Sequence, residues 1–168
     1  MMESGTSRRK SRVPMRAALA MLALVLCAVP TALAQDRTSK LEEEYRLAKD
    51  PVRKARALAK LGPLKIERAH SYLKADDEEQ ALATLEQYRD EVRKTSDALA
   101  ATNVNAQKRP GGFKELQIGL RQSIRRLDQL IVLVPEDKRP WFEAVRSDLS
   151  ATQNSLIEAL FPTVVKNS

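Results

Sequence analysis

Apolar side chains recur at intervals of three and four residues along most of the chain, which is the pattern of helices with one buried face. The clearest stripe covers about residues 113–134 and consists of Phe113, Leu116, Leu120, Ile124, Leu127, Ile131 and Val134. Weaker stripes with the same period predict helices over about 39–50, 51–75, 77–103 and 141–161. The sequence therefore predicts about five successive helices.

Local signals for helix starts agree with these stripes. A Ser or Asp followed three residues later by Glu forms a capping box, and such boxes begin at Ser39 and at Asp76. Asp50 followed by Pro51 marks another start, because Asp caps free N–H groups and Pro needs no N–H in the first turn. The stripe of the second helix crosses Pro63 without changing phase, so that helix is predicted to be continuous and kinked there.

Composition supports an all-α fold. Of 168 residues only 5 are Gly and 4% are aromatic, whereas strand-rich domains need more of both. The sequence shows one clear loop, over 103–112, and the other connections are short. Short turns between long helices make neighbouring helices antiparallel. Residues 76–91 hold seven acids and one base, and 105–126 hold six bases and one acid, so these two segments are predicted to pair. We therefore expect an antiparallel bundle of about five helices.

The N-terminus has the composition of an export signal. The first 16 residues include five basic side chains, and the next 13 carry no charged or hydrogen-bonding side chain except a cysteine. The small-residue motif Ala32-Leu33-Ala34 then predicts cleavage before Gln35. Cleavage would leave an exported protein, periplasmic or secreted. The alternative is an uncleaved segment that anchors the protein in a membrane.

This signal determines the predicted domain division and the charge of the mature chain. We expect a signal peptide over 1–34, a helical bundle domain over 35–162 and a frayed tail over 163–168. The whole chain has a net charge of +7, but residues 35–168 keep 24 basic and 21 acidic residues, a net charge of +3. Much of the basic character thus belongs to the export signal, and nucleic acid is not an expected partner.

Residues 65–92 resemble one helix-turn-helix unit of a tetratricopeptide repeat. Ala69 and Tyr72 stand where the repeat has its small residue and its tyrosine in the first helix. Ala81 follows Ala69 at the spacing of the repeat's alanine, and Leu85 fills its large apolar position. No second copy is recognisable at the repeat's period of about 34 residues. The resemblance implies a helical hairpin, with Tyr72 and Ala81 as packing residues, and recognition of a protein or peptide.

No pattern of catalytic or cofactor-binding residues stands out. The chain has one His, His70, and one Cys, which leaves no Cys/His zinc site, and no catalytic residue, cofactor or metal is expected. The acidic runs fall at helix starts and on solvent faces, where carboxylates do not acquire the shifted pKa values that glycoside hydrolysis needs. A hydrolase without a recognisable motif is the third alternative for function.

Two sets of side chains are candidates for contact with a partner. The basic patch predicted for the fourth helix and the loop before it consists of Lys108, Arg109, Arg121, Arg125 and Arg126. The apolar set at the C-terminus consists of Ile157, Phe161, Val164 and Val165, which lie off the stripe of the last helix or follow it. This apolar set is either covered by the first two helices or exposed as an interaction site. Trp141 is predicted to anchor the core, or otherwise to lie in an interface.

These observations favour an exported, non-enzymatic protein of the cell envelope that acts as an interaction, adaptor or scaffold protein. Its expected partner is another envelope protein or a second copy of the chain. The alternative is charge-driven binding of anionic envelope lipid or polymer through the basic patch. Contact with a membrane would then arise only from an uncleaved signal anchor or from weak contact at the surface.

Overall fold

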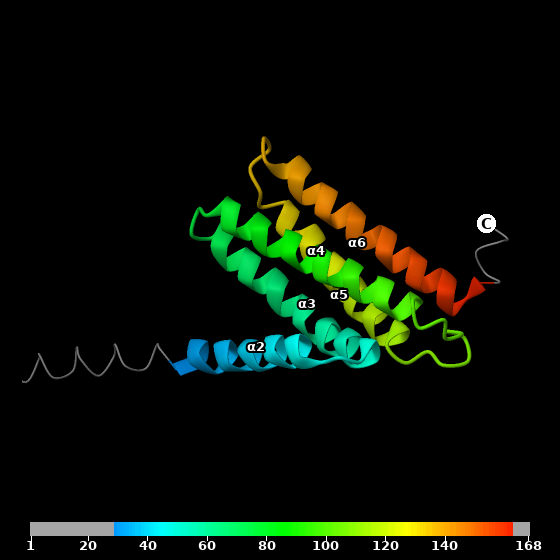
Figure 1. Cartoon of the computed structure of the whole chain (residues 1–168). Coiled ribbons are helices and arrows are strands. Elements are labelled where there is room, and N and C mark those ends of the chain that lie inside the picture. The colour runs from blue at the N-terminus through cyan, green and yellow to red at the C-terminus, as the bar shows by residue number, and fades with distance from the viewer. Residues whose placement is uncertain (1–28, 163–168) are drawn as a thin grey trace, which may run out of the picture. The chain divides into compact units, whose positions relative to one another are not determined.

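The computed structural model describes residues 29–162, and within this range it contains five helices and no strand (Figure 1). The helices are α2 (Val29–Leu47), α3 (Pro51–Leu73), α4 (Glu78–Ala100), α5 (Phe113–Ile131) and α6 (Arg139–Leu160). The predicted all-α bundle is confirmed. Contacts divide the chain into Met1–Asp36 and Arg37–Ser168, and the second unit forms the bundle. The basic and most of the apolar part of the predicted signal peptide, and the tail with Val164 and Val165, lie outside the described residues.

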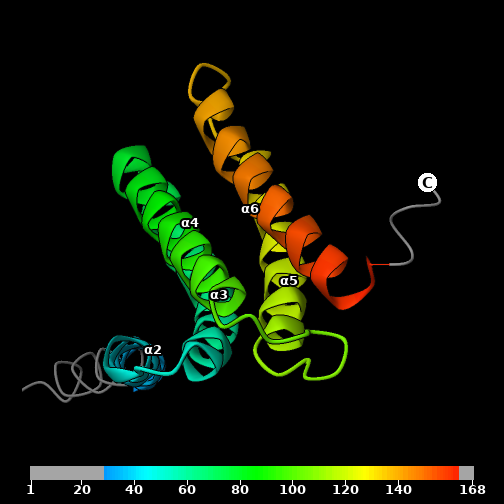
Figure 2. The same ribbon diagram turned by 45° about the vertical axis from the view of Figure 1, so that its right-hand side comes forward.

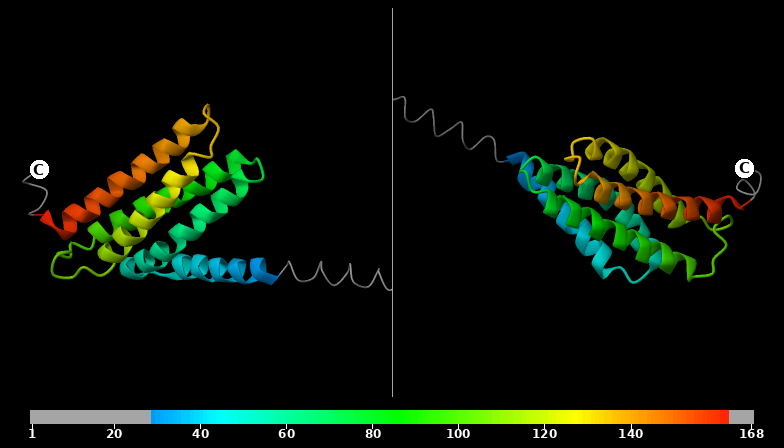
Figure 3. Two further views of the ribbon diagram at one scale, coloured as in Figure 1. Left: turned by 180° about the vertical axis from the view of Figure 1, so that it is seen from behind. Right: turned by 90° about the horizontal axis from the view of Figure 1, so that it is seen from above.

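The bundle consists of two antiparallel hairpins stacked side by side, α3–α4 and α5–α6 (Figure 2). The loop over 101–112 returns the chain to the end where α3 begins, so α3 and α5 run parallel, and so do α4 and α6 (Figures 1 and 3). Helix α3 packs on α4 and α5, while α6 packs on α5 and α4. The predicted side-by-side pairing of the third and fourth helices is therefore wrong, because α4 and α5 lie diagonally opposite each other.

Helix starts agree with the sequence at one position and differ at two. Asp50 caps α3, since its carboxylate accepts a hydrogen bond from the Arg53 N–H at 3.0 Å. Helix α4 is capped by Asp77 and not by Asp76, because Asp76 has a left-handed φ of 55° and closes the turn after α3. The box at Ser39 marks no helix start in the full chain, because α2 begins earlier, at Val29.

The start of α5 depends on a glycine. Gly112 has a φ of 84°, which favours a residue without a Cβ, and its N–H donates to Glu115 Oε2 at 2.7 Å. An added Cβ at this position would lie 2.8 Å from Leu99 Cδ2 and 3.2 Å from Val52 Cα. The loop before α5 is therefore seated tightly between the end of α4 and the start of α3.

A buried hydrogen bond crosses the core between the diagonal helices. Tyr88 on α4 is fully buried, and its hydroxyl donates to Ser123 Oγ on α5 at 3.0 Å. Burial raises the pKa of Tyr88, so the phenol stays a neutral donor. Gly62 on α3 faces this pair so closely that an added Cβ would overlap both hydroxyl groups and lie 2.8 Å from Tyr88 Cζ.

A second close approach joins the two parallel helices α3 and α5. An added Cβ at Gly119 would lie 2.6 Å from the backbone Cα of Ala59. Since backbone cannot move aside as a flexible side chain can, the two helices pack at a distance that only a glycine allows. Glycines on α3 and α5 thus set how the second hairpin sits against the first.

We expect Gly62→Ala to destabilise the protein by about 1–3 kcal/mol, because the added methyl group overpacks the Tyr88–Ser123 contact. This loss should outweigh the gain of up to about 1 kcal/mol from the better helix propensity of Ala. Urea denaturation measures the free energy of unfolding. The matched control is Gly111→Ala, where the nearest atoms to an added Cβ lie at 3.6 and 3.8 Å and the change should be small. A Gly62→Ala protein as stable as the wild type would show that the contact is not tight.

Candidate functional site

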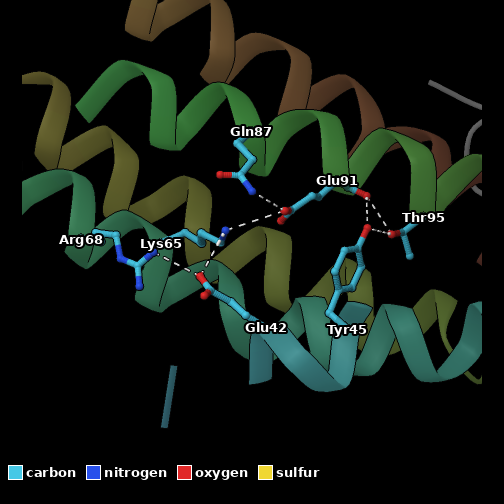
Figure 4. Close-up of polar contacts among 7 residues, drawn as sticks. All are labelled: Glu42, Tyr45, Lys65, Arg68, Gln87, Glu91 and Thr95. Carbon is cyan, nitrogen blue, oxygen red and sulfur yellow. Dashed lines mark hydrogen bonds and ion pairs between the residues drawn. The ribbon is translucent and has the colours of Figure 1, made fainter. Parts of the chain in front are cut away.

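A buried lysine connects three helices at the junction of α2, α3 and α4 (Figure 4). Lys65 on α3 is only 3% exposed, an unusual position for a lysine. Its Nζ lies 3.4 Å from Glu42 Oε1 on α2 and 3.7 Å from Glu91 Oε1 on α4. One ammonium group therefore neutralises carboxylates from both neighbouring helices.

Tyr45 extends the same contact from α2 (Figure 4). Its hydroxyl donates to the backbone oxygen of Glu91 at 3.3 Å and lies 3.2 Å from Thr95 Oγ1. Burial raises the pKa of Tyr45 and the charge of Glu91 adds to this effect, while the hydrogen bond with Thr95 opposes it. Lys54 Nζ lies 5.4 Å from the centre of the Tyr45 ring, a cation–π distance.

The outer side of this cluster opens on a surface hollow of about 460 Å³. Arg68 Nη1 lies 3.2 Å from Glu42 Oε1, and Gln87 Nε2 donates to Glu91 Oε1 at 2.9 Å. Within the described part of the chain, Glu91 Oε2 is buried without a hydrogen-bond partner. The cluster pairs acids with cations and brings no nucleophile beside a base. These contacts join α2 to α3 and α4.

His70 lies in a different hollow, between α3 and α5, with a volume of about 380 Å³. Glu67 and Arg126 line the same hollow, and Arg126 Nη1 lies 3.9 Å from Glu67 Oε2. Arg126 thus pairs with α3 and not with the acidic start of α4 as predicted. Over residues 29–162 no group of three His, Cys, Asp or Glu side chains is placed to hold a metal ion.

The structure divides the predicted basic patch. Arg121 and Arg125 are exposed on α5, and among the described residues neither has a carboxylate within ion-pair distance. Lys108 and Arg109 lie instead on the loop over 101–112. The expected pairing of this patch with residues 76–91 does not occur, because α5 lies diagonally opposite α4.

Trp141 is 57% exposed, so the prediction that it anchors the core is wrong. The next residue, Phe142, is fully buried and takes that place. Phe142 lies three residues before Val145 and seven before Leu149, which matches the buried face of α6. The buried stripe of α6 was therefore recognisable in the sequence. Its spacing did not decide whether Trp141 or Phe142 is the first buried residue.

The exposed Trp141 stands at one end of a groove between the parallel helices α4 and α6. Here it lines a hollow of about 350 Å³ together with Leu82, Glu86, Arg89 and Ala144. A second hollow of about 370 Å³ continues between the same helices, lined by Arg89, Arg93, Ser96, Asp97, Ala100, Asp148, Ala151, Thr152 and Ser155. Arg89 Nη1 lies 3.7 Å from Asp148 Oδ2 where the two hollows meet. We call these two hollows together the α4/α6 groove.

The groove was not predicted, because the packing of α4 beside α6 joins residues about sixty positions apart. The only hint in the sequence is the run of small side chains on the outer side of both helices, including Ser96, Ala100, Ala151 and Ser155. Small side chains leave space between two helices, but they do not identify which helices are neighbours.

The C-terminal apolar set lies at the opposite end of α6 from Trp141. Ile157 is half-buried, and Phe161 is 55% exposed just beyond the end of the helix. Val164 and Val165 lie outside the described residues, so the extent of this apolar surface stays a prediction.

Comparison with protein-family profiles, with curated proteins and with solved structures gives no match for this chain. The hairpin implied by the tetratricopeptide resemblance is present as α3–α4, with Tyr72 packed against the core and Ala81 fully buried. Membership of that repeat family stays a prediction. None of the helices in the described part of the chain is both long and apolar enough to cross a bilayer.

We expect Lys65→Met to destabilise the protein by about 1–3 kcal/mol, because the mostly buried carboxylate of Glu91 would lose its cation. The cost should be below the 3–5 kcal/mol typical of fully buried pairs, roughly, because Glu42 keeps contact with water and with Arg68. The matched control is Arg68→Met, which removes an exposed partner of the same Glu42 and should change stability by less than about 1 kcal/mol. Equal free energies of unfolding for the two variants would show that the buried Lys65 contributes no more to stability than the exposed Arg68.

Proposed function

We propose that this protein is an exported, non-enzymatic adaptor or scaffold of the cell envelope that binds a helical segment of another protein in the α4/α6 groove. The observation that carries the proposal is the exposed Trp141 at one end of the groove. Tryptophan and arginine are the residues most enriched among those that dominate binding energy at interfaces, and Arg89 and Arg93 line the same groove.

The energy available at Trp141 supports a binding role. A tryptophan side chain has an area of about 200 Å², and burying the exposed half of it is worth about 2–3 kcal/mol. A single exposed aromatic residue on a monomer is ordinary, but this one closes a groove with small side chains along its floor. The groove therefore offers both an anchor point and room for a partner.

The length of the groove fits a helical partner. Its lining extends along α4 from Leu82 to Ala100, which at 1.5 Å per residue is about 27 Å. A partner helix of about 18 residues would span it, and small residues allow two helices to approach closely.

Site-specific crosslinking tests the groove. A photoreactive amino acid at position 141 or 151 should capture the same envelope protein, because both positions line the groove. The control is position 118, an exposed apolar site on α5 outside the groove, which should not capture it. Trp141→Ala should weaken binding of the captured protein at least about tenfold. Equal capture from position 118 would contradict the proposal.

The fluorescence of Trp141 gives an independent measurement, because it is the only tryptophan in the chain. In the free protein its emission should resemble that of a hydrated indole. Addition of the captured partner should shift the emission to shorter wavelength as the ring leaves water. An emission that does not move on binding would place the partner elsewhere.

Export is tested by the mass of the protein outside the cytoplasm. The residue pattern of 1–34 predicts that the mature chain begins at Gln35, which can cyclise. Intact-mass spectrometry of the exported protein should give the mass of 35–168. A full-length chain found only with membranes would instead identify an uncleaved anchor.

A further inference from the structure

The α2–α3 turn, the start of α3 and the loop over 101–112 come together at one end of the bundle (Figure 1). An added Cβ at Gly111 would lie 3.6 Å from Arg56 Nη2 and 3.8 Å from Val52 Cγ1. Segments nearly sixty residues apart therefore share one surface. This surface shares no residue with the lining of the α4/α6 groove and includes only two residues of the predicted basic patch.

Several exposed basic side chains at this end have no ion-pair partner among the described residues. Within residues 38–162, none of the following exposed cations has a carboxylate within ion-pair distance: Lys49, Arg53, Lys60, Lys108, Arg109 and Lys114. We call these six residues the basic end. Arg56 is paired with Glu115 at 2.9 Å, and Asp50 is occupied in capping α3. Glu44 is the one acid that lines the adjoining hollow.

Apolar side chains lie among these cations. Leu47 is 63% exposed and lines a hollow of about 450 Å³ together with Arg53, Arg56 and Lys60. Val104 is exposed on the neighbouring loop. A soluble polyanion would pair with the cations but would gain little from an exposed leucine. The boundary between lipid headgroups and acyl chains accommodates both kinds of side chain.

We propose that the basic end docks the protein on the surface of an anionic phospholipid bilayer, with its cations at lipid phosphates and Leu47 in the headgroup region. This contact is at the membrane surface and needs no helix that crosses it. Each lysine or arginine near an anionic membrane strengthens binding by roughly fivefold at low salt, and the effect decreases as salt is added. With six such residues, the basic end has enough charge for reversible attachment.

This inference does not depend on the proposed docking groove. Trp141 and the lining of the α4/α6 groove belong to α4 and α6, whereas the cations of the basic end lie on the α2–α3 turn, on α3, on the 101–112 loop and at the start of α5. Trp141→Ala should therefore leave vesicle binding unchanged, and substitutions at the basic end should leave the crosslinks from position 141 unchanged. Failure of one proposal is thus distinguishable from failure of the other.

Vesicle flotation tests the proposal with the exported protein purified from the cells that make it. The protein should float with vesicles that contain phosphatidylglycerol and not with vesicles of phosphatidylcholine alone. The double variant Lys108→Glu with Arg109→Glu should bind at least about tenfold more weakly. The matched control is Arg121→Glu with Arg125→Glu, which changes the net charge by the same amount on α5 and should lose less than about threefold. Circular dichroism verifies that both variants stay folded.

A second comparison separates a bilayer from a soluble polymer. Leu47→Ser should weaken binding to phosphatidylglycerol vesicles several-fold and leave binding to dextran sulfate unchanged, because only the bilayer offers an apolar phase. Dextran sulfate bound as tightly as vesicles, with no effect of Leu47→Ser, would overturn the proposal in favour of a polymer. Equal losses for the two charge-reversal variants would overturn it in favour of a general effect of net charge.

Discussion

The hydrogen bond between Tyr88 and Ser123 fixes how the two hairpins of the bundle sit against each other. It joins the diagonal helices α4 and α5 inside the core, where an unpaired hydroxyl would be costly. Only a residue without a side chain can face this pair from α3, and Gly62 is that residue. Buried polar groups need a hydrogen-bond partner with the correct geometry, so they specify one arrangement of the helices more strictly than apolar contacts alone.

The exposed surfaces follow from that arrangement. Because α3 lies beside α5 and α4 beside α6, every loop of the bundle falls at one of two ends. The start of α3 and the 101–112 loop meet at one end, so the positive charges of their lysines and arginines are concentrated there. The turns after α3 and α5 meet at the other end, and Lys138 Nζ lies 3.3 Å from Glu78 Oε2 there. The α4/α6 groove and the basic end thus both result from the packing of α3 beside α5 and of α4 beside α6.

Helix content and most helix bounds could be predicted from the sequence, because the spacing of apolar residues is a local property. The burial of Leu116, Leu120 and Leu127 on α5 agrees with their stripe. Neighbour relations could not be predicted. The charges of 76–91 and 105–126 suggested a pair of adjacent helices, but α3 and α6 each pack on both α4 and α5, which therefore lie on a diagonal. The residue that caps α4 was also ambiguous, since Asp76 and Asp77 are equally good caps by residue type. In the structure Asp76 belongs to the turn after α3 and Asp77 is the cap.

The attachment of α2 differs in kind from the packing of the other helices. Helices α3 to α6 approach each other closely along their backbones, whereas α2 is not among the closely packed pairs. Leu41 and Tyr45 pack against the core, and the polar contacts of α2 are chiefly those of Glu42 with Lys65 and of Tyr45 with the backbone of Glu91. Segments with few close contacts open most easily, and contacts between charges weaken as ions screen them. In hydrogen exchange, α2 should therefore behave as a separate unit whose opening depends on ionic strength, while the two hairpins open together.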